Sequence, residues 1–197
     1  MKTIKTILFT ITLFTLLAIQ GCYFSEFIET RIFLSEDNKP AKIIINYQNI
    51  SSGEAKTSDV RNDFDELIKD WKGDEYLLER AEERLFIKNR EVFIQDDKVC
   101  ARVTGIIKDL NDVYSFWVSN GERIMMFDDE DYELVESNGK ILKTNKNTLI
   151  VWPDDARELY WKQRFTEESE SLEKNRPLMV KWLQEYLATQ PDSSRHN

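Results

Sequence analysis

The first 21 residues constrain the fold most, because they set a short apolar segment apart from the rest of the chain. Lys2 and Lys5 give this segment a basic start, and the 13 residues from Ile7 to Ile19 carry no charge. A helix needs about 20 apolar residues to span the hydrocarbon core of a membrane. A basic start followed by a shorter apolar run is typical of an export signal. We therefore expect residues 1–21 to be removed as a signal peptide, with an uncleaved signal anchor as the alternative.

The end of this segment, Ile19-Gln20-Gly21-Cys22, resembles the lipobox of bacterial lipoproteins. Ile19 and Gly21 match that motif, whereas Gln20 stands where a small residue is usual. The resemblance implies cleavage after Gly21, diacylglycerol on the sulfur of Cys22, and acylation of the new amino terminus by a fatty acid such as palmitate. Two or three acyl chains would hold the protein on a membrane permanently.

The same resemblance implies a location in the cell envelope. The lipidated protein would face the periplasm or the exterior. Tyr23, and not aspartate, follows the lipidated cysteine. Aspartate at this position is associated with retention in the inner membrane of some Gram-negative bacteria. The expected location in such a cell is therefore the outer membrane.

The part of the chain after the signal is acidic. It has 176 residues, a normal length for one domain. It carries 25 basic and 36 acidic residues, which gives a net charge of −11. Such a charge repels nucleic acid, and no basic stripe offsets it. We predict no nucleic-acid partner; the expected partners are the membrane, through the lipid on Cys22, and another envelope protein.

Only two cysteines are present, Cys22 and Cys100. If Cys22 carries lipid, no disulfide can form within the chain, and the domain must be held together by packing. Cys100 lies in an apolar, strand-like segment, which predicts a small buried side chain. A reactive thiol needs a neighbouring base or cation, but the one histidine, His196, is next to the C-terminus.

Residues 27–189 alternate between strand-like and helix-like segments. They predict one α+β domain with a mostly antiparallel sheet of roughly eight strands. Residues 22–26 would form a short lipidated bridge before this domain. Residues 190–197 are polar and predict a disordered tail after it.

Three helices are expected. Two follow a first hairpin formed by residues 27–34 and 41–50. The first begins near Ser58 as its N-cap. It ends at Lys72-Gly73, and Asp74 can cap the second. Mixed charges on the second helix, Arg80 among them, predict a solvated face. A C-terminal helix is expected with Pro177 in its first turn.

The remaining segments predict strands. Asn138-Gly139 lies between two of them and predicts a hairpin, because both residue types accept a positive φ. These strand-like segments are residues 92–94, 99–107, 123–127, 132–136, 140–144, 148–152 and 158–165. The last is ambiguous: Asp154-Asp155-Ala156-Arg157 would suit the start of a helix, and we favour a strand for 158–165.

No pattern of residues indicates catalysis or a cofactor. A single histidine excludes a histidine-based zinc site and a Ser–His–Asp triad, and no glycine-rich phosphate loop is present. We therefore predict no catalytic residue, no metal site and no cofactor. The run Asp128–Glu133 is the densest acidic patch; it predicts a solvated loop, with calcium binding as the alternative.

Trp117 is the one residue that the sequence suggests as an exposed contact. Most of the five tryptophans are expected in the core. Trp117 instead lies beside Ser119-Asn120-Gly121, close to an expected loop. An exposed aromatic side chain there is suited to binding a partner, a membrane or an apolar ligand. Of Met125 and Met126, one must face away from the core if their segment is a strand.

Three functions are consistent with these observations. The first is a lipid-anchored, non-catalytic binding or structural domain of the cell envelope. The second is a carrier or sensor of an apolar ligand such as a lipid, which needs an apolar cavity of several hundred Å³. The third, more distant, is a hydrolase that uses a pair of carboxylates.

Overall fold

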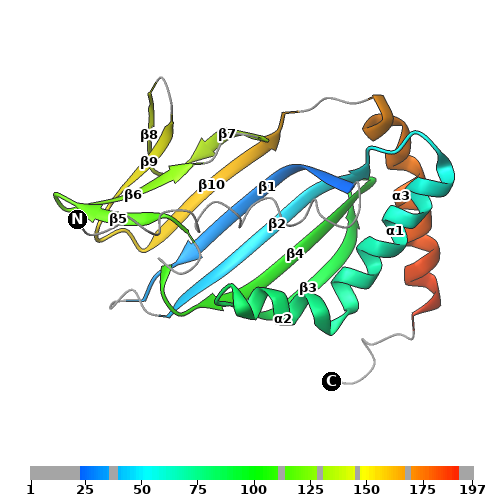
Figure 1. Cartoon of the computed structure of the whole chain (residues 1–197), viewed down its shortest axis with the longest axis horizontal. Helices are drawn as coiled ribbons and strands as arrows, with labels where there is room; N and C mark the ends of the chain where they lie inside the picture. Colours follow the sequence, from blue (N-terminus) through cyan, green and yellow to red (C-terminus); the bar gives the residue numbers. More distant parts are fainter. Residues whose placement is uncertain are drawn as a thin grey trace, which may run out of the picture.

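A computed structural model describes residues 23–35, 40–110, 114–127, 131–144, 147–166 and 170–190. These residues form three helices and ten strands, which make two antiparallel sheets (Figure 1). The α+β class is therefore confirmed. The strands differ from the expectation in two ways: there are ten rather than about eight, and they are divided between two sheets.

The larger sheet has six strands and forms the middle of the molecule (Figure 1). Its strands alternate between side chains in the core and side chains at the surface, as a half-covered antiparallel sheet requires. In β2, for example, Ile43 is fully buried and Ile44 is not. In spatial order the strands are β3 (Leu85–Gln95), β4 (Lys98–Ile107), β2 (Ala41–Ser52), β1 (Tyr23–Phe33), β10 (Glu158–Phe165) and β7 (Tyr132–Ser137).

β1 begins earlier than the sequence indicates. Residues 23–26, expected as part of a bridge, are its first residues, and 23–25 pair with the end of β2. Tyr23 is buried, and its hydroxyl donates a hydrogen bond of 2.8 Å to Asp70 Oδ2. This contact and the strand pairing hold a segment that is too short and too polar to be recognised as a strand by itself. Cys22 lies outside the described residues.

The helices cover part of the larger sheet. They are α1 (Thr57–Lys72), α2 (Asp74–Glu82) and α3 (Glu170–Thr189). α3 packs against β2 and β4, α1 contacts α3 and the sheet, and α2 contacts β3. The buried positions of α1 and α3 follow the helical period, and they include Phe64, Leu67, Met179 and Leu183.

Two expected helix starts are wrong. α1 is capped by Lys56, without a side-chain hydrogen bond, rather than by Ser58. α3 begins at Glu170, seven residues before Pro177. Its first turns are held by tertiary contacts: Ser51 donates to the carbonyl of Leu172, and the Asn175 amide donates to the carbonyls at the end of β2 and beyond it. These contacts outweigh the poor fit of proline inside a helix. Of the expected tail, residues 191–197 lie outside the described residues.

The smaller sheet has four strands, in the order β5 (Phe116–Ser119), β6 (Glu122–Phe127), β9 (Thr148–Pro153) and β8 (Lys140–Lys143). One face packs on the larger sheet, and a single core joins the two. At their contact, the rings of Trp152 and Trp161 lie 6.4 Å apart, and those of Tyr114 and Trp161 lie 5.3 Å apart.

The expected hairpin at Asn138-Gly139 is wrong. β7 pairs with β10 in the larger sheet, whereas β8 pairs with β9 in the smaller one, so the chain changes sheets at these two residues. The Asn138 side chain accepts hydrogen bonds from Trp152 Nε1 and the Tyr160 amide, at 2.7 and 2.9 Å. Gly139 is needed for close approach, because a Cβ there would lie 2.7 Å from Trp152 Nε1.

The two ends of the larger sheet differ. The start of β1, the end of β10 and the start of α3 meet at one end, which we call the Tyr23 end (Figure 1). The smaller sheet lies at the other end, where β1 finishes and β10 begins (Figure 1). The protein therefore has its first described residue at one end and its second sheet at the other.

Candidate functional site

The smaller sheet presents an apolar face away from the core. Strand pairing places Trp117, Ile124 and Val151 in one row on this face. A second row joins Met126, Leu149 and Leu142. We call these six residues the outer apolar face. The opposite face, which includes Phe116, Met125 and Ile150, is buried in the core.

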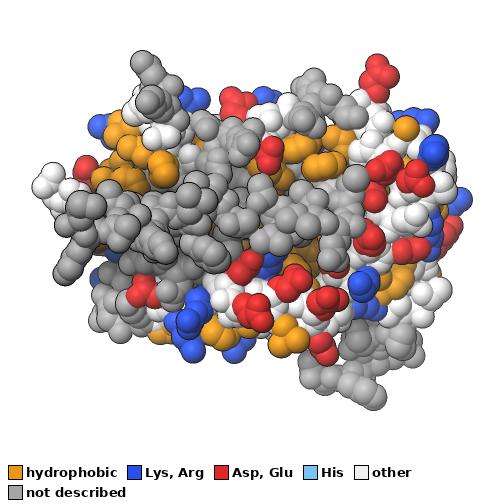
Figure 2. Space-filling view, in the orientation of Figure 1, with side chains coloured by type: hydrophobic (Ala, Val, Ile, Leu, Met, Phe, Trp, Pro, Cys, Tyr) orange, Lys and Arg blue, Asp and Glu red, His pale blue; other side chains and the backbone are white. Residues whose placement is uncertain are grey.

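Three of the six side chains of the outer apolar face are exposed, whereas Ile124 and Leu149 are half-buried and Val151 is only 6% exposed. Trp117 is 41% exposed, Met126 is 47% exposed and Leu142 is 38% exposed. Figure 2 shows hydrophobic side chains gathered at the upper left, over the strands of the smaller sheet. Among the described residues, five of the eight large hydrophobic side chains that are exposed belong to this sheet: three lie on the outer apolar face, and Val118 and Ile141 lie on the other face. A gathered apolar surface of this kind indicates an interaction site rather than ordinary surface composition.

The structure places Trp117 in β5, at the edge of the smaller sheet and close to the turn that follows this strand. Asn120 and Gly121, both with positive φ, form the tight turn to β6. The expected split of the two methionines is confirmed, since Met125 is 4% exposed and Met126 is on the outer apolar face. The role of Trp117 in contacting a partner stays a prediction.

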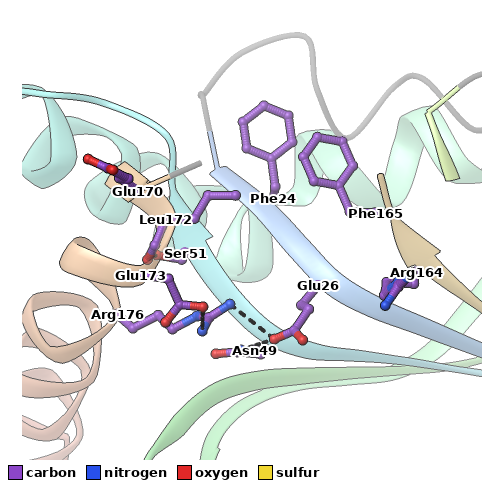
Figure 3. Close-up of a pocket in the computed structure, with 10 residues that line it drawn as sticks. All are labelled: Phe24, Glu26, Asn49, Ser51, Arg164, Phe165, Glu170, Leu172, Glu173 and Arg176. Carbon is purple, nitrogen blue, oxygen red and sulfur yellow. Dashed lines mark hydrogen bonds and ion pairs between the residues drawn. The ribbon is translucent and has the colours of Figure 1, made fainter. Parts of the chain in front are cut away.

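A pocket at the Tyr23 end was not predicted from the sequence. It has a volume of about 430 Å³ and is formed by β1, β2, β10 and α3 (Figure 3). The rings of Phe24 and Phe165 stack beside it, with centroids 4.7 Å apart. Five of its ten lining residues are charged, so its chemistry is mixed. The full set is Phe24, Glu26, Asn49, Ser51, Arg164, Phe165, Glu170, Leu172, Glu173 and Arg176.

A polar network crosses this pocket. The regular pairing of β1 and β2 is interrupted at Glu26 and Asn49, and Asn49 has a φ of 60°. Asparagine tolerates this left-handed conformation better than most residues. The Asn49 side chain donates to Glu26, which also accepts from Arg176 Nη2 at 3.0 Å. Glu173 accepts a further hydrogen bond from Arg176 Nη1 (Figure 3).

Arg80 is buried, contrary to the expected solvated face of α2. Its side chain pairs with Glu83 at 2.6 Å and lies over the ring of Tyr76 at 5.2 Å. Burial raises the pKa of the Glu83 carboxyl, although the neighbouring Arg80 opposes this shift. Burial also raises the pKa of Tyr47 and Tyr76. The spacing of charges along α2 does not indicate this burial. Tyr76 lies on the same helix, but Tyr47, which also interacts with Arg80, comes from β2.

The other candidate residues have simpler outcomes. Cys100 is buried in β4 as a free thiol, as predicted. Of the acidic run Asp128–Glu133, residues 128–130 lie outside the described residues. In the described part of the chain, no group of three or more His, Cys, Asp and Glu side chains is placed to hold a metal ion. No helix of the described residues is long and apolar enough to cross a membrane.

Comparison with known proteins adds no family or relative. No protein-family model, curated protein or solved structure matches this chain.

Proposed function

We propose that the chain is an exported lipoprotein, held on a membrane by lipid on Cys22, whose domain binds another protein of the cell envelope without catalysis. The outer apolar face carries this proposal. Its exposed side chains, Trp117, Met126 and Leu142, lie on β5, β6 and β8, and it is flanked by the edges of β5 and β8. An exposed apolar face with an aromatic anchor such as Trp117 suits a protein partner.

The position of this face favours a protein partner over the bilayer. A lipid on Cys22 is attached one residue before β1, at the Tyr23 end of the larger sheet. The outer apolar face belongs to the sheet at the opposite end (Figure 1). The acidic surface of the domain also opposes binding to anionic lipid head groups. The face is therefore better placed to meet a protein than to lie on the anchoring membrane.

A carrier of an apolar ligand is the second candidate. Its support is the size of the pocket, about 430 Å³, which falls in the range of ligand sites. Its charged lining makes it a poor site for an acyl chain, because burying hydrocarbon against carboxylates leaves those carboxylates poorly solvated. A hydrolase has less support, since Glu26 and Glu173, the carboxylates of this polar network, both bind Arg176.

Metabolic labelling with palmitate tests the anchor. The wild-type chain in its native host should take up the label, and Cys22→Ala should abolish it while Cys100→Ala leaves it unchanged. An equal label in wild type and Cys22→Ala would contradict lipidation at this residue.

Photocrosslinking in the living cell tests the binding surface. A photoreactive residue in place of Leu142 should give a protein adduct of defined mass, and a second change, Trp117→Ser, should reduce its yield. The matched control replaces Leu78, which is 66% exposed on α2 and far from the outer apolar face in sequence and fold. An equal adduct from both positions, or an adduct with lipid alone, would contradict a protein partner at this surface.

A further inference from the structure

The pocket at the Tyr23 end is next to the expected lipid anchor. One of its lining residues, Phe24, comes only two residues after Cys22. Two residues of chain span at most about 7 Å, and the head-group layer on each side of a bilayer is about 5–8 Å thick. Tyr23 and Phe24 already belong to β1, so no flexible segment separates the pocket from the anchor. A lipid on Cys22 would therefore place this pocket close to the head groups of the membrane.

Charged side chains of this pocket are accessible to a ligand. Arg164, at the end of β10, is 49% exposed, and Glu173, in the first turn of α3, is 71% exposed. Glu170, in the same turn of α3, is exposed as well. Figure 3 shows Arg164 on one side of the pocket and the two glutamates on the other. A molecule that enters the pocket can therefore meet a guanidinium group and carboxylates.

The balance of charge around the pocket favours a zwitterion. Its lining has three carboxylates and two guanidinium groups. Glu26 and Glu173 share Arg176, so the carboxylates together have one negative charge more than the guanidinium groups can neutralise. An anion alone would be repelled by these carboxylates, and a cation alone would not use Arg164. A guanidinium has five N–H donors, so Arg164 can bind a phosphate oxygen while its Nη2 donates to Glu133.

The cationic part of such a zwitterion is best matched by a primary ammonium group. Carboxylates only accept hydrogen bonds when ionised, and a primary ammonium has three N–H donors, whereas a quaternary ammonium has none. The stacked rings of Phe24 and Phe165 line the same pocket, with centroids 4.7 Å apart. They offer an apolar surface to the glycerol part of a lipid, next to its head group.

We propose that this pocket holds the head group of a zwitterionic phospholipid with a primary ammonium group, such as phosphatidylethanolamine. The phosphate binds Arg164, the ammonium binds the glutamates of α3, and the acyl chains stay in the bilayer. A volume of about 430 Å³ is in the range of small-molecule sites. This inference rests on the proposed lipid anchor, which brings the pocket to the membrane. It is independent of the protein partner proposed for the outer apolar face.

Native mass spectrometry of the full-length gene product, purified from its native host in detergent, tests this pocket. The probes are dihexanoyl phosphatidylethanolamine, the phosphatidylcholine and phosphatidylglycerol with the same chains, and free phosphoethanolamine. Phosphatidylethanolamine should bind at least about fivefold more tightly than each of the others, the upper end for one charge pair at a partly exposed site. Equal binding of either other lipid would overturn the ammonium assignment. Equal binding of free phosphoethanolamine would overturn the lipid source, and no binding of any probe would overturn the site.

Matched variants locate the binding. Arg164→Gln should weaken binding of phosphatidylethanolamine by about fivefold. Its control is Arg102→Gln, since Arg102 is 44% exposed, pairs with a glutamate as Arg164 does, and does not line the pocket. Glu170→Gln should weaken binding by a similar factor, and its control is Glu185→Gln, farther along α3. Equal effects at pocket and control positions would place binding elsewhere and overturn the proposal.

The same spectra separate this proposal from that of the anchor, because acyl groups on Cys22 add to the mass of the intact chain. An acylated chain that does not bind phosphatidylethanolamine would overturn the pocket proposal and leave the anchor supported. A chain without acyl groups that still binds this lipid through Arg164 would support the pocket and contradict the anchor.

Discussion

The two sheets share a core but differ in what covers their remaining surfaces. On the larger sheet, α3 packs over β2 and β4, α1 contacts β1, β2 and β3, and the smaller sheet lies at the far end. On the smaller sheet, one face is buried against Trp161 while the other exposes Trp117 and Met126. The three described helices all contact strands of the larger sheet.

This difference separates apolar side chains that stabilise the fold from those of the outer apolar face. The buried side chains of both sheets exclude water from one continuous core. The outer apolar face gains no such burial from the described helices. Its hydrophobic side chains are therefore better explained by an interaction than by stability. Four predictions separate the two roles, from the largest expected effect to the smallest.

Trp152 tests whether the two sheets form one cooperative unit. It is 1% exposed at their contact. Trp152→Ala should lower the free energy of unfolding by about 3–5 kcal/mol, the usual cost of deleting a buried aromatic side chain. Urea unfolding followed by circular dichroism measures the loss. Wild-type unfolding should occur in one transition; two separate transitions would show that the sheets are independent and would break the comparison.

The adjacent methionines of β6 test the two faces of the smaller sheet directly. Met125→Ala should cost about 2–5 kcal/mol because it leaves a cavity in the core. Met126→Ala, on the outer apolar face, should change stability by no more than about 0.5 kcal/mol. Thermal unfolding of both variants makes the measurement. Similar losses would mean that the outer face is covered within the protein.

The two Asn-Gly pairs test the change of sheets. Gly139→Ala should cost about 1–3 kcal/mol, because its Cβ would press against Trp152 in a packed interior. In Gly121→Ala the added Cβ has no atom within 4 Å, so only the backbone strain of a φ of 75° destabilises the protein. That strain costs about 1–2 kcal/mol. Urea titrations of the two variants give the comparison. A greater loss for Gly121→Ala would contradict the close contact of Gly139 with Trp152.

Alkaline pH should weaken the tyrosine-lined part of the core. Burial raises the pKa of Tyr23, Tyr47 and Tyr114, and raises that of Tyr132 to about 12. Above pH 10 the unfolded chain therefore binds fewer protons than the folded one, and stability that is complete below pH 10 is lost as the pH rises. Tyr23 and Tyr114, which are both buried, should each remove about 1.4 kcal/mol by pH 11.

Absorbance of tyrosinate against pH checks this expectation. The signal of the buried tyrosines should appear together with the loss of circular dichroism. Their ionisation near pH 10 in a chain that is still folded would contradict their burial.

Local sequence patterns predicted most secondary-structure elements. The β-branched run 41–50 and the apolar period of residues 60–71 correspond to β2 and α1, and 158–165 is β10. The turn at Asp96 and Asp97, both with positive φ, also lies between the expected strands 92–94 and 99–107. These features depend on neighbours in the chain, which is why the sequence indicates them.

The division into two sheets could not be predicted in this way. Asn138-Gly139 has the composition of a tight turn, but its conformation is decided by Trp152 and Tyr160, which are distant in sequence. The burial of Arg80, a residue of α2, likewise depends on residues that are distant in sequence. Trp117 could be suggested as exposed, whereas the rest of the outer apolar face required knowledge of strand register.

The pocket could not be predicted from the sequence either, because its lining residues are distant in sequence. Glu26 and Arg176 are 150 residues apart and meet only because β1 lies beside α3. No spacing or motif connects them. Asn49 gives no signal either, since an asparagine late in a strand-like run is more readily interpreted as the strand's end.

The burial of Tyr23 has a consequence for how far the domain can reach. If Cys22 is fixed in a bilayer, the next residue already belongs to the folded domain, so no flexible linker separates the domain from its lipid anchor. Such a domain tilts and rotates on its anchor but does not search the space beyond its own length. A partner that it binds must therefore come to the membrane surface, or belong to it.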